Sequence, residues 1–216
     1  MSDDASRLRE RLVHRLWAAG TIQDPAIRTT MINVPRDAFL PQVSLESAYA
    51  DEVVPLKIRD ETVLSTASQP TMIALMLGQL HVRRGDAVLE IGTGSGYNAA
   101  LLSELAGLGG QVVTIDLEPD LVEIAAERLR SIGCTNVSAV CADGRHGWPG
   151  QAPYDRIVMT ASTAAVPAVL FEQLREAGRL VVPIGGAEYQ RSSLFERRNG
   201  TVGLRETIPC QFIPLR

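Results

Sequence analysis

The sequence predicts an α/β protein built on a doubly wound, mostly parallel β-sheet. Three observations lead to this prediction. From Asp86 onward, short apolar runs alternate with segments of helical periodicity. The first of these runs ends in a glycine-rich loop that opens a helix. The last part of the chain is rich in β-forming residues around Asn199-Gly200, a dipeptide that favours a hairpin turn, so the sheet is expected to end in antiparallel strands.

The N-terminal part is expected to be helical and then irregular. Apolar residues recur at helical spacing over residues 5–19, which predicts an amphipathic helix. A second helix is expected after Asp24-Pro25, an N-cap residue followed by a proline at the first helical position. The prolines in Val34-Pro35 and Leu40-Pro41 then predict irregular structure.

The alternating region supplies most of the predicted sheet. Apolar runs bounded by turn residues predict the strands, and the longer segments between them predict the helices. The expected strands cover residues 87–91, 111–115, 137–141, 154–159 and 179–183. The expected helices cover residues 97–106, 119–132 and 167–174. Two further β-rich stretches cover residues 192–197 and 205–213.

Composition excludes several classes of protein. The chain has 216 residues, 45% of them hydrophobic, which suits one globular domain with a core that needs no disulfide. A net charge of −4 argues against a general nucleic-acid binder. The three cysteines lack metal-ligand spacing, so we expect no metal and reduced thiols in a cytoplasmic protein. The polar start from Met1 and the lack of long apolar runs predict neither a secretory signal nor a membrane span.

The strongest local signal is the glycine loop from Glu90 to Tyr97, which reads E-I-G-T-G-S-G-Y. Glycines let a chain turn tightly and approach a ligand with its backbone, at the carboxyl end of a strand. A dinucleotide fingerprint would need glycine at position 97, where this chain has tyrosine. The loop therefore favours a nucleoside without pyrophosphate.

Acidic residues at strand ends strengthen this prediction. Asp116 ends the second expected strand, where a carboxylate can accept both ribose hydroxyl hydrogens. Asp143, followed by Gly144, comes after the third strand, where a carboxylate can accept from an adenine amino group. Glu90 is expected to assist a cationic end of the ligand. Each residue alone is a common helix cap or solvated group, but their order around one glycine loop indicates a nucleoside site.

This arrangement resembles the class I S-adenosylmethionine-dependent methyltransferases over residues 69–185. The resemblance implies a Rossmann-like, seven-stranded sheet with S-adenosyl-L-methionine as cofactor and S-adenosyl-L-homocysteine as product. The residues expected to bind the cofactor are Glu90, Gly92, Thr93, Gly94, Gly96, Asp116, Leu117, Asp143 and Gly144.

More specific segments resemble the protein-L-isoaspartate O-methyltransferase family. Val34 to Pro41 resembles its V-P-R-x-x-F-x-P segment, and Thr66 to Pro70 resembles its T-I-S-[AQ]-P loop. Pro153 to Ile157 resembles its P-Y-D-x-I strand. Further segments that resemble the family cover residues 48–56, 143–148, 178–185 and 212–215. The ordered set spans nearly the whole chain.

The resemblance implies methylation of the carboxylate of L-isoaspartyl residues in proteins or peptides, which leads through a methyl ester to a succinimide and to repair. It assigns the catalytic role to Ser68, and we expect Ser65, Thr66 and Thr160 to contact the substrate. It also implies a single methyltransferase domain over residues 1–216. Within it we expect N-terminal helices and a substrate loop in 1–67, a cofactor-binding core in 68–185 and C-terminal antiparallel strands in 186–216.

Two departures from the family concern the substrate and the chain end. The family has a glycine-bearing P-I-G-x-G-Q segment before T-I-S, whereas this chain has a longer run without glycines from Leu56 to Ser65. The altered loop from Arg59 to Ser65 favours an alternative, a peptide-maturation methyltransferase that acts on one Asp of a ribosomally made precursor and yields aspartimide or isoaspartate. The chain also stops at Arg216, so we expect no cofactor contacts from a longer tail.

Two other classes fit the sequence less well. A nucleoside-binding or regulatory protein without catalysis would not need Ser68, Asp116 and Asp143 together. A DNA amino-methyltransferase would carry an acidic or Asn-Pro-Pro-aromatic motif after the fourth strand, but residues 160–163 read T-A-S-T.

Overall fold

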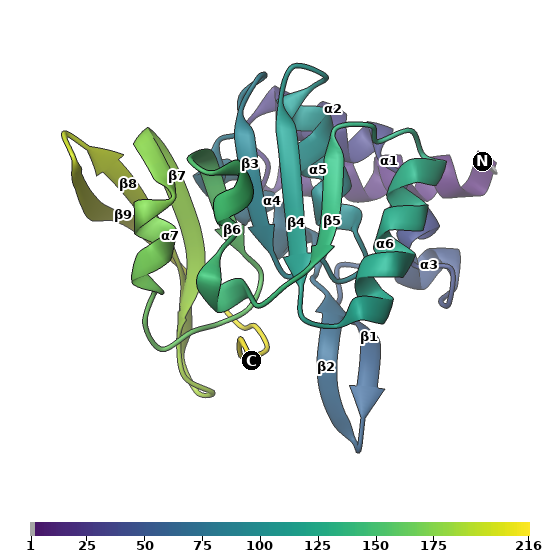
Figure 1. Ribbon diagram of the computed structural model, residues 1–216. Coiled ribbons are helices and arrows are strands. Elements are labelled where there is room, and N and C mark those ends of the chain that lie inside the picture. The colour runs from purple at the N-terminus through teal and green to yellow at the C-terminus, as the bar shows by residue number, and fades with distance from the viewer. Residues whose placement is uncertain (1–2) are drawn as a thin grey trace.

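The computed structural model describes residues 3–216, so the polar start at Met1 and Ser2 lies outside the described residues. Seven strands form one sheet in the order β5-β4-β3-β6-β7-β8-β9 (Figure 1). The pairs from β5 to β7 are parallel, and β8 and β9 are antiparallel additions, which confirms the predicted fold class. The strands are β3 (Ala87–Ile91), β4 (Gln111–Asp116), β5 (Val137–Cys141), β6 (Tyr154–Met159), β7 (Leu174–Gly185), β8 (Gln190–Arg198) and β9 (Thr201–Cys210).

The central strands are apolar on both faces because both faces are covered. Val88 of β3 belongs to one hydrophobic cluster and its neighbour Leu89 to the other, and both side chains are fully buried. Alternate residues of a strand point to opposite faces, so this pattern requires helices or loops on each side. The near-continuous apolar runs of the sequence have this origin.

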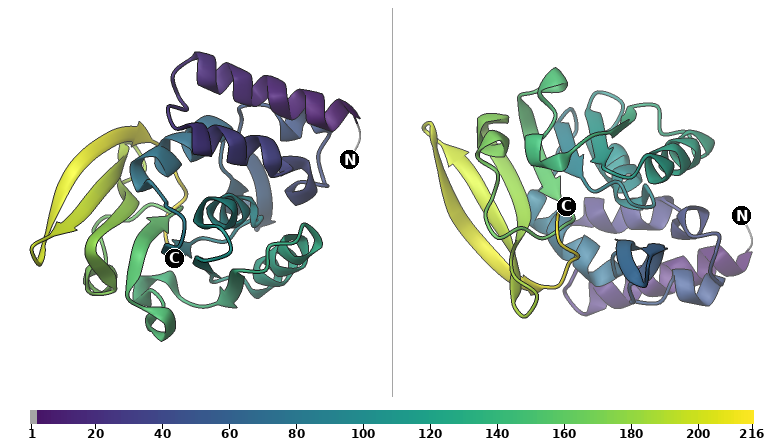
Figure 2. Two further views of the ribbon diagram at one scale, coloured as in Figure 1. Left: turned by 90° about the horizontal axis from the view of Figure 1, so that it is seen from above. Right: turned by 60° about the horizontal axis from the view of Figure 1, so that its bottom comes forward.

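Helices α4 (Pro70–Leu80), α5 (Tyr97–Ala106) and α6 (Pro119–Ser131) contribute buried residues to the first cluster, whereas Leu170 of α7 (Ala168–Glu172) belongs to the second. The N-terminal helices α1 (Asp3–Ala18) and α2 (Pro25–Asn33) add an outer layer on the face of the first cluster (Figure 2). As predicted, Asp24 caps α2, where its carboxylate accepts a hydrogen bond from Ala26 N at 2.8 Å.

The expected irregular region contains two short helices, η1 (Arg36–Phe39) and α3 (Leu45–Ala48). The 3-10 helices η2 (Gly144–His146) and η3 (Pro149–Gln151) follow β5. Phe39 is fully buried, and its carbonyl accepts from Arg128 of α6 at 2.8 Å. This contact ties the N-terminal segment to the helix that follows β4.

The segment that departs from the family is a β-hairpin and not a loop. Strands β1 (Val54–Arg59) and β2 (Thr62–Ala67) pair antiparallel and turn at Asp60 and Glu61, whose φ angles are 48° and 63°. This two-residue turn has the left-handed backbone of hairpin turns without the usual glycine, which is why its sequence gave no hairpin signal. The hairpin projects from the lower edge of the sheet (Figure 1).

Several expected boundaries differ from the structure. The helix expected at 167–174 ends at Glu172, and Leu174 already pairs with Tyr154 as the first residue of β7. The last strand ends at Cys210 and not at 213. The backbone of Phe212 bonds to the Gln190 side chain instead of a neighbouring strand, because Gln190 donates to the Phe212 carbonyl and accepts from its N–H. The turn predicted at Asn199-Gly200 is confirmed, with φ angles of 52° and 75°.

Candidate active site

Three adjoining cavities lie at the carboxyl ends of the central strands. The first cavity is lined by residues 64–66, 115–117 and 213–216, with parts of the glycine loop, Gly144, Thr160 and Ala161. The central cavity shares Thr66, Gly92, Gly94 and Thr160 with it, and adds residues such as Arg36, Ser68, Tyr97 and Asn98. The outer groove shares Thr66, Ser68 and Phe212 with the central cavity, and adds Val53, Gln69, Met72, Ala187, Gln190 and other residues between 209 and 214.

The glycine loop between β3 and α5 lies directly against the ends of its neighbouring strands. The N–H groups of Gly92 and Thr93 both donate to Ile115 O of β4, at 2.8 and 3.2 Å. A Cβ atom at Gly92 would lie 2.2 Å from Thr160 Oγ1, and the φ angle of Gly92 is 102°. Only glycine fits there, so the loop presents bare backbone to the first and central cavities.

Thr160 supports this loop, although the sequence assigned it to the substrate. Its hydroxyl lies 2.9 Å from Gly92 O and 3.1 Å from Ile91 O and donates to these carbonyls. The Thr160 hydroxyl proton is therefore engaged in hydrogen bonds to the protein backbone. Thr160 still lines the first and central cavities with the rest of its surface.

Asp116 ends β4 beside the glycine loop, as predicted, and lines the first cavity with Leu117. Its Oδ2 accepts from Gly94 N at 3.0 Å and its Oδ1 accepts from Glu118 N at 3.1 Å. Each carboxylate oxygen can accept a second hydrogen bond. The half-buried side chain therefore shapes the loop and keeps acceptor capacity at the cavity wall.

Asp143 lies differently from the prediction. Its carboxylate accepts from Arg145 N at 2.9 Å and from the Arg145 guanidinium at 2.6 and 3.0 Å, and these bonds lower the pKa of Asp143 to about 2. Gly144, and not Asp143, lines the first cavity. An adenine contact from Asp143 would require its carboxylate to share the hydrogen bonds that Arg145 donates.

Glu90 is fully buried beneath the glycine loop and lines none of the three cavities. Its Oε2 accepts from Thr114 Oγ1 at 2.6 Å and its Oε1 accepts from Asn98 Nδ2 at 2.8 Å. Burial raises the pKa of Glu90 to about 7, against the opposing effect of these two hydrogen bonds. Glu90 thus connects β4 to Asn98, which does line the central cavity.

Ser68 follows β2 and lies where the central cavity opens into the outer groove. Thr66 lines all three cavities, and Ser65, which is buried, lines the first. The structure therefore brings the predicted substrate residues of β2 and the predicted cofactor residues of the glycine loop together. A bound molecule in the first cavity and another in the groove would meet at the central cavity.

Comparison with known proteins agrees with this geometry. A family model described as Protein-L-isoaspartate(D-aspartate) O-methyltransferase matches residues 6–216. The chain is 39% identical over 211 residues to the protein-L-isoaspartate O-methyltransferase of Methanopyrus kandleri, covering 97% of this chain and 91% of that one. The corresponding protein of Methanoculleus marisnigri is 40% identical, with 99% and 94% covered. The chain belongs to the protein-L-isoaspartate(D-aspartate) O-methyltransferase family.

Solved structures agree on the fold. One protein-L-isoaspartate O-methyltransferase superposes with a TM-score of 0.87 at 34% identity, covering 95% of this chain and 65% of that longer one. A Plasmodium falciparum protein, solved in complex with S-adenosyl-L-homocysteine, has a TM-score of 0.81 at 23% identity, with 96% and 98% covered. Both likenesses confirm the predicted class I methyltransferase fold.

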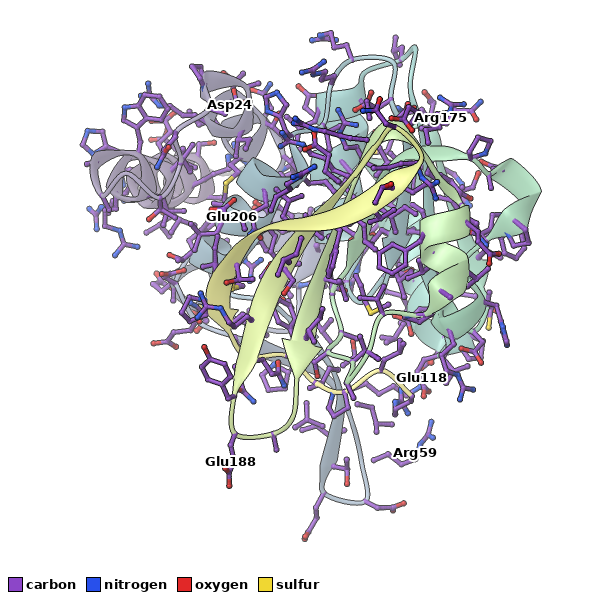
Figure 3. All side chains as sticks on the ribbon, turned by 90° about the vertical axis from the view of Figure 1, so that its left-hand side faces the viewer. Asp24, Arg59, Glu118, Arg175, Glu188 and Glu206 are labelled. Carbon is purple, nitrogen blue, oxygen red and sulfur yellow. The ribbon has the colours of Figure 1, made fainter. Side chains whose placement is uncertain are left out.

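The β1–β2 hairpin is fastened to Glu118, the residue that precedes α6 and follows the first-cavity residues Asp116 and Leu117. Lys57 Nζ lies 2.6 Å from Glu118 Oε2. Arg59 Nη2 lies 2.9 Å from the same atom, and both Arg59 and Glu118 are labelled in Figure 3. Arg216 Nη2 contacts Glu118 Oε1 at 2.9 Å. The hydrogen bonds from Lys57 and Arg216 lower the pKa of Glu118 to about 2. One buried carboxylate at the start of α6 thus joins the hairpin to the C-terminal residues.

The C-terminal residues themselves form a wall of the first cavity. Ile213 O accepts from Ser162 N, and Leu215 N donates to Ser162 O, both at 2.8 Å. Residues 213–216 line this cavity, although sequence analysis did not assign them to the site. The Arg36, Lys57 and Glu118 contacts also escaped sequence analysis, although Arg36 stands in the V-P-R segment that marks the family.

Two structural features are absent within residues 3–216. No helix in that range has the length and apolar character needed to cross a membrane. The same residues contain no group of three or more His, Cys, Asp or Glu side chains that could hold a metal ion.

The raised pKa of Glu90 predicts a pH-dependent stability. Between about pH 4.5 and 7 the unfolded state ionises Glu90 while the folded state keeps it protonated, so the free energy of unfolding falls as pH rises. Glu90→Gln should remove this fall and be more stable than the parent above pH 7, by up to about 3 kcal/mol. Urea titrations from pH 5 to 9 measure the difference, with exposed Glu127→Gln as control. Parallel pH profiles for Glu90→Gln and the parent protein would contradict the prediction.

Proposed function

We propose that this chain transfers a methyl group from S-adenosyl-L-methionine to the carboxylate of an L-isoaspartyl residue in a protein or peptide. The observation that supports this proposal most directly is that the central cavity and the outer groove meet at Thr66 and Ser68. A small bound cofactor on the glycine-loop side can there reach an acceptor that enters from the solvent side. Membership of the family supplies the acceptor chemistry.

The residues around the first cavity fit the cofactor. Asp116 keeps acceptor capacity for ribose hydroxyls. The apolar side chain of Leu117 and the backbone of Gly144 offer a surface for the adenine base. Gly92, Thr93 and Gly94 line the central cavity and present backbone to the amino-acid end. Gly96, the fourth predicted residue of this loop, packs against Ala125 and Phe39. Glu90 acts on that end indirectly, through Asn98. Asp143, another member of the predicted set, pairs with Arg145 and does not line the first cavity.

The chain's own residues need to align the reactants more than to move protons. The bound cofactor supplies a methyl group on a cationic sulfur, and a carboxylate at neutral pH is already deprotonated, so no base is required. Ser68 is placed to donate a hydrogen bond to the acceptor carboxylate and set its direction. Ile73, Met76 and Phe212 line the central cavity and exclude water, which favours a reaction that cancels charge.

Ester chemistry explains how methylation would repair a protein. A methyl ester is neutral and electrophilic, whereas an ionised carboxylate resists attack, so the neighbouring amide nitrogen attacks the ester carbonyl, expels methanol and forms a succinimide without further enzyme action. Hydrolysis of the succinimide then returns some normal aspartate. We propose that the chain carries out this repair as one domain in the cytoplasm, where its three free cysteines stay reduced.

The β1–β2 hairpin supports a second candidate, the peptide-maturation methyltransferase. Val53 is half exposed at the base of the hairpin and lines the outer groove, and Ile58 is 60% exposed on β1. A projecting, partly apolar hairpin beside the groove could select one dedicated peptide over damaged proteins in general.

Asp116→Ala should weaken binding of S-adenosyl-L-homocysteine by about 1–3 kcal/mol, because ribose hydroxyls lose their acceptor in a half-buried site. Calorimetric titration measures the affinity, and Glu123→Ala on the exposed side of α6 is the control. Undiminished affinity in the Asp116 variant would remove this residue from the cofactor site.

Ser68→Ala should keep the fold and the affinity for S-adenosyl-L-homocysteine but slow methyl transfer about tenfold to a thousandfold, since one positioning hydrogen bond is lost. Steady-state rates on an isoaspartyl peptide measure the effect. Ser131→Ala, an exposed serine of α6, serves as control. Wild-type turnover by the Ser68 variant would exclude the assigned role.

The acceptor is tested with cofactor that carries a radioactive methyl group. Methyl esters release labelled methanol in mild alkali, whereas methylated amines do not. Volatile label from an isoaspartyl peptide, and none from its aspartyl counterpart, is expected for the repair function. Label on neither, but on a precursor peptide encoded beside the gene, would favour maturation. Base-stable label would refute both functions.

A further inference from the structure

Arg36 is a buried cation at the junction of the central cavity and the substrate side. Only 1% of its surface is exposed, and its guanidinium lies 5.1 Å from the centre of the Tyr97 ring. Its Nε donates to Ala48 O and its Nη2 donates to Ser68 O, both at 2.9 Å. Within the described residues its Nη1 has no hydrogen-bond partner.

Stability alone is a poor explanation for this arrangement. Burying a guanidinium costs several kcal/mol, and apolar side chains of similar volume often serve a core equally well. The desolvation of Arg36 lowers its pKa below the ordinary arginine value. Both of its hydrogen-bond acceptors are main-chain carbonyls, so the guanidinium fixes the positions of two backbone segments relative to each other.

The backbone that receives the Nη2 bond lies outside regular secondary structure. Strand β2 ends at Ala67 and α4 begins at Pro70, so Ser68 lies in neither element. Its carbonyl is fixed by a charge-assisted hydrogen bond from a side chain that also packs against Tyr97, the first residue of α5. Arg36 therefore sets the position of Ser68 relative to the helix that follows the glycine loop.

We propose that Arg36 is a positioning residue for methyl transfer, which holds the Ser68 segment at the distance from the glycine loop that the reaction requires. The inference rests on the role proposed above for Ser68. A displacement of about 1 Å in a reacting group can cost about a hundredfold in rate, so a single main-chain hydrogen bond can matter this much. Lysine cannot replace it, because one ammonium does not span two carbonyls in the planar geometry of a guanidinium.

The test is a double-mutant cycle on kcat with Arg36→Lys and Ser68→Ala. Arg36→Lys should lower kcat about tenfold to a hundredfold in the parent protein, yet less than about twofold when Ser68 is already alanine. Affinity for S-adenosyl-L-homocysteine, measured by calorimetry, should stay within about twofold. Arg36→Gln, which is uncharged and less costly to bury, is measured alongside in case the lysine variant does not fold, and the same non-additivity is expected.

Arg156→Lys is the matched control. Arg156 is 7% exposed and donates to His81 O at 3.0 Å, but it lies in β6 opposite Val88, away from the carboxyl ends of the strands. Its replacement should lower the melting temperature and leave kcat unchanged. Equal losses of kcat from the Arg36 variants in both backgrounds would assign Arg36 a merely structural role. A loss of cofactor affinity as large as the loss of kcat would also overturn the proposal. Wild-type turnover by Ser68→Ala alone would refute the role of Ser68 itself, and so separates the two failures.

Discussion

The site depends on the close contact between the glycine loop and the ends of β4 and β6. Two successive N–H groups of the loop donate to Ile115 O, and Gly94 N donates to Asp116. On the other side, Thr160 leaves no room for a Cβ atom at Gly92. Parallel strands bring these ends to one edge of the sheet, and the glycines let the loop lie against them. The cavities exist because this backbone is bare and fixed.

A buried carboxyl supports the loop from below. Glu90 accepts hydrogen bonds from Thr114 and Asn98, and Thr114 Oγ1 lies 2.8 Å from Thr93 Oγ1. These contacts join β3, β4 and the first turn of α5, and the side chains of Glu90, Thr93 and Thr114 are buried. A fully satisfied polar network of this kind holds one arrangement of the loop, since any other would leave buried groups unpaired.

The substrate side is built from segments far apart in the chain. The β1–β2 hairpin supplies Thr66, the segment between β2 and α4 supplies Ser68, and the C-terminal segment supplies Phe212. Glu118 fastens the hairpin and the C-terminal Arg216 to the start of α6, two residues after Asp116. Ion pairs at partly buried sites resist screening better than exposed ones. The β1–β2 hairpin is thus joined by ion pairs to the start of α6, next to the first cavity.

The sequence by itself determined the succession of strands and helices along the chain from Asp86 onward and the glycine loop, because apolar periodicity and glycine spacing are local signals. Its ordered motifs also determined the family. Strands 87–91, 137–141 and 154–159 were predicted to the residue. Only the tertiary structure decided which polar groups face the cavities. It gave Thr160 and Glu90 supporting roles, paired Asp143 with Arg145, and formed a hairpin whose turn lacks glycine. It also brought the Arg36 side chain within hydrogen-bond distance of Ser68 O, which lies 32 positions later in the chain. Apart from the Asp143–Arg145 pair and the hairpin turn, which are local, these contacts depend on packing between distant segments, which no local pattern encodes.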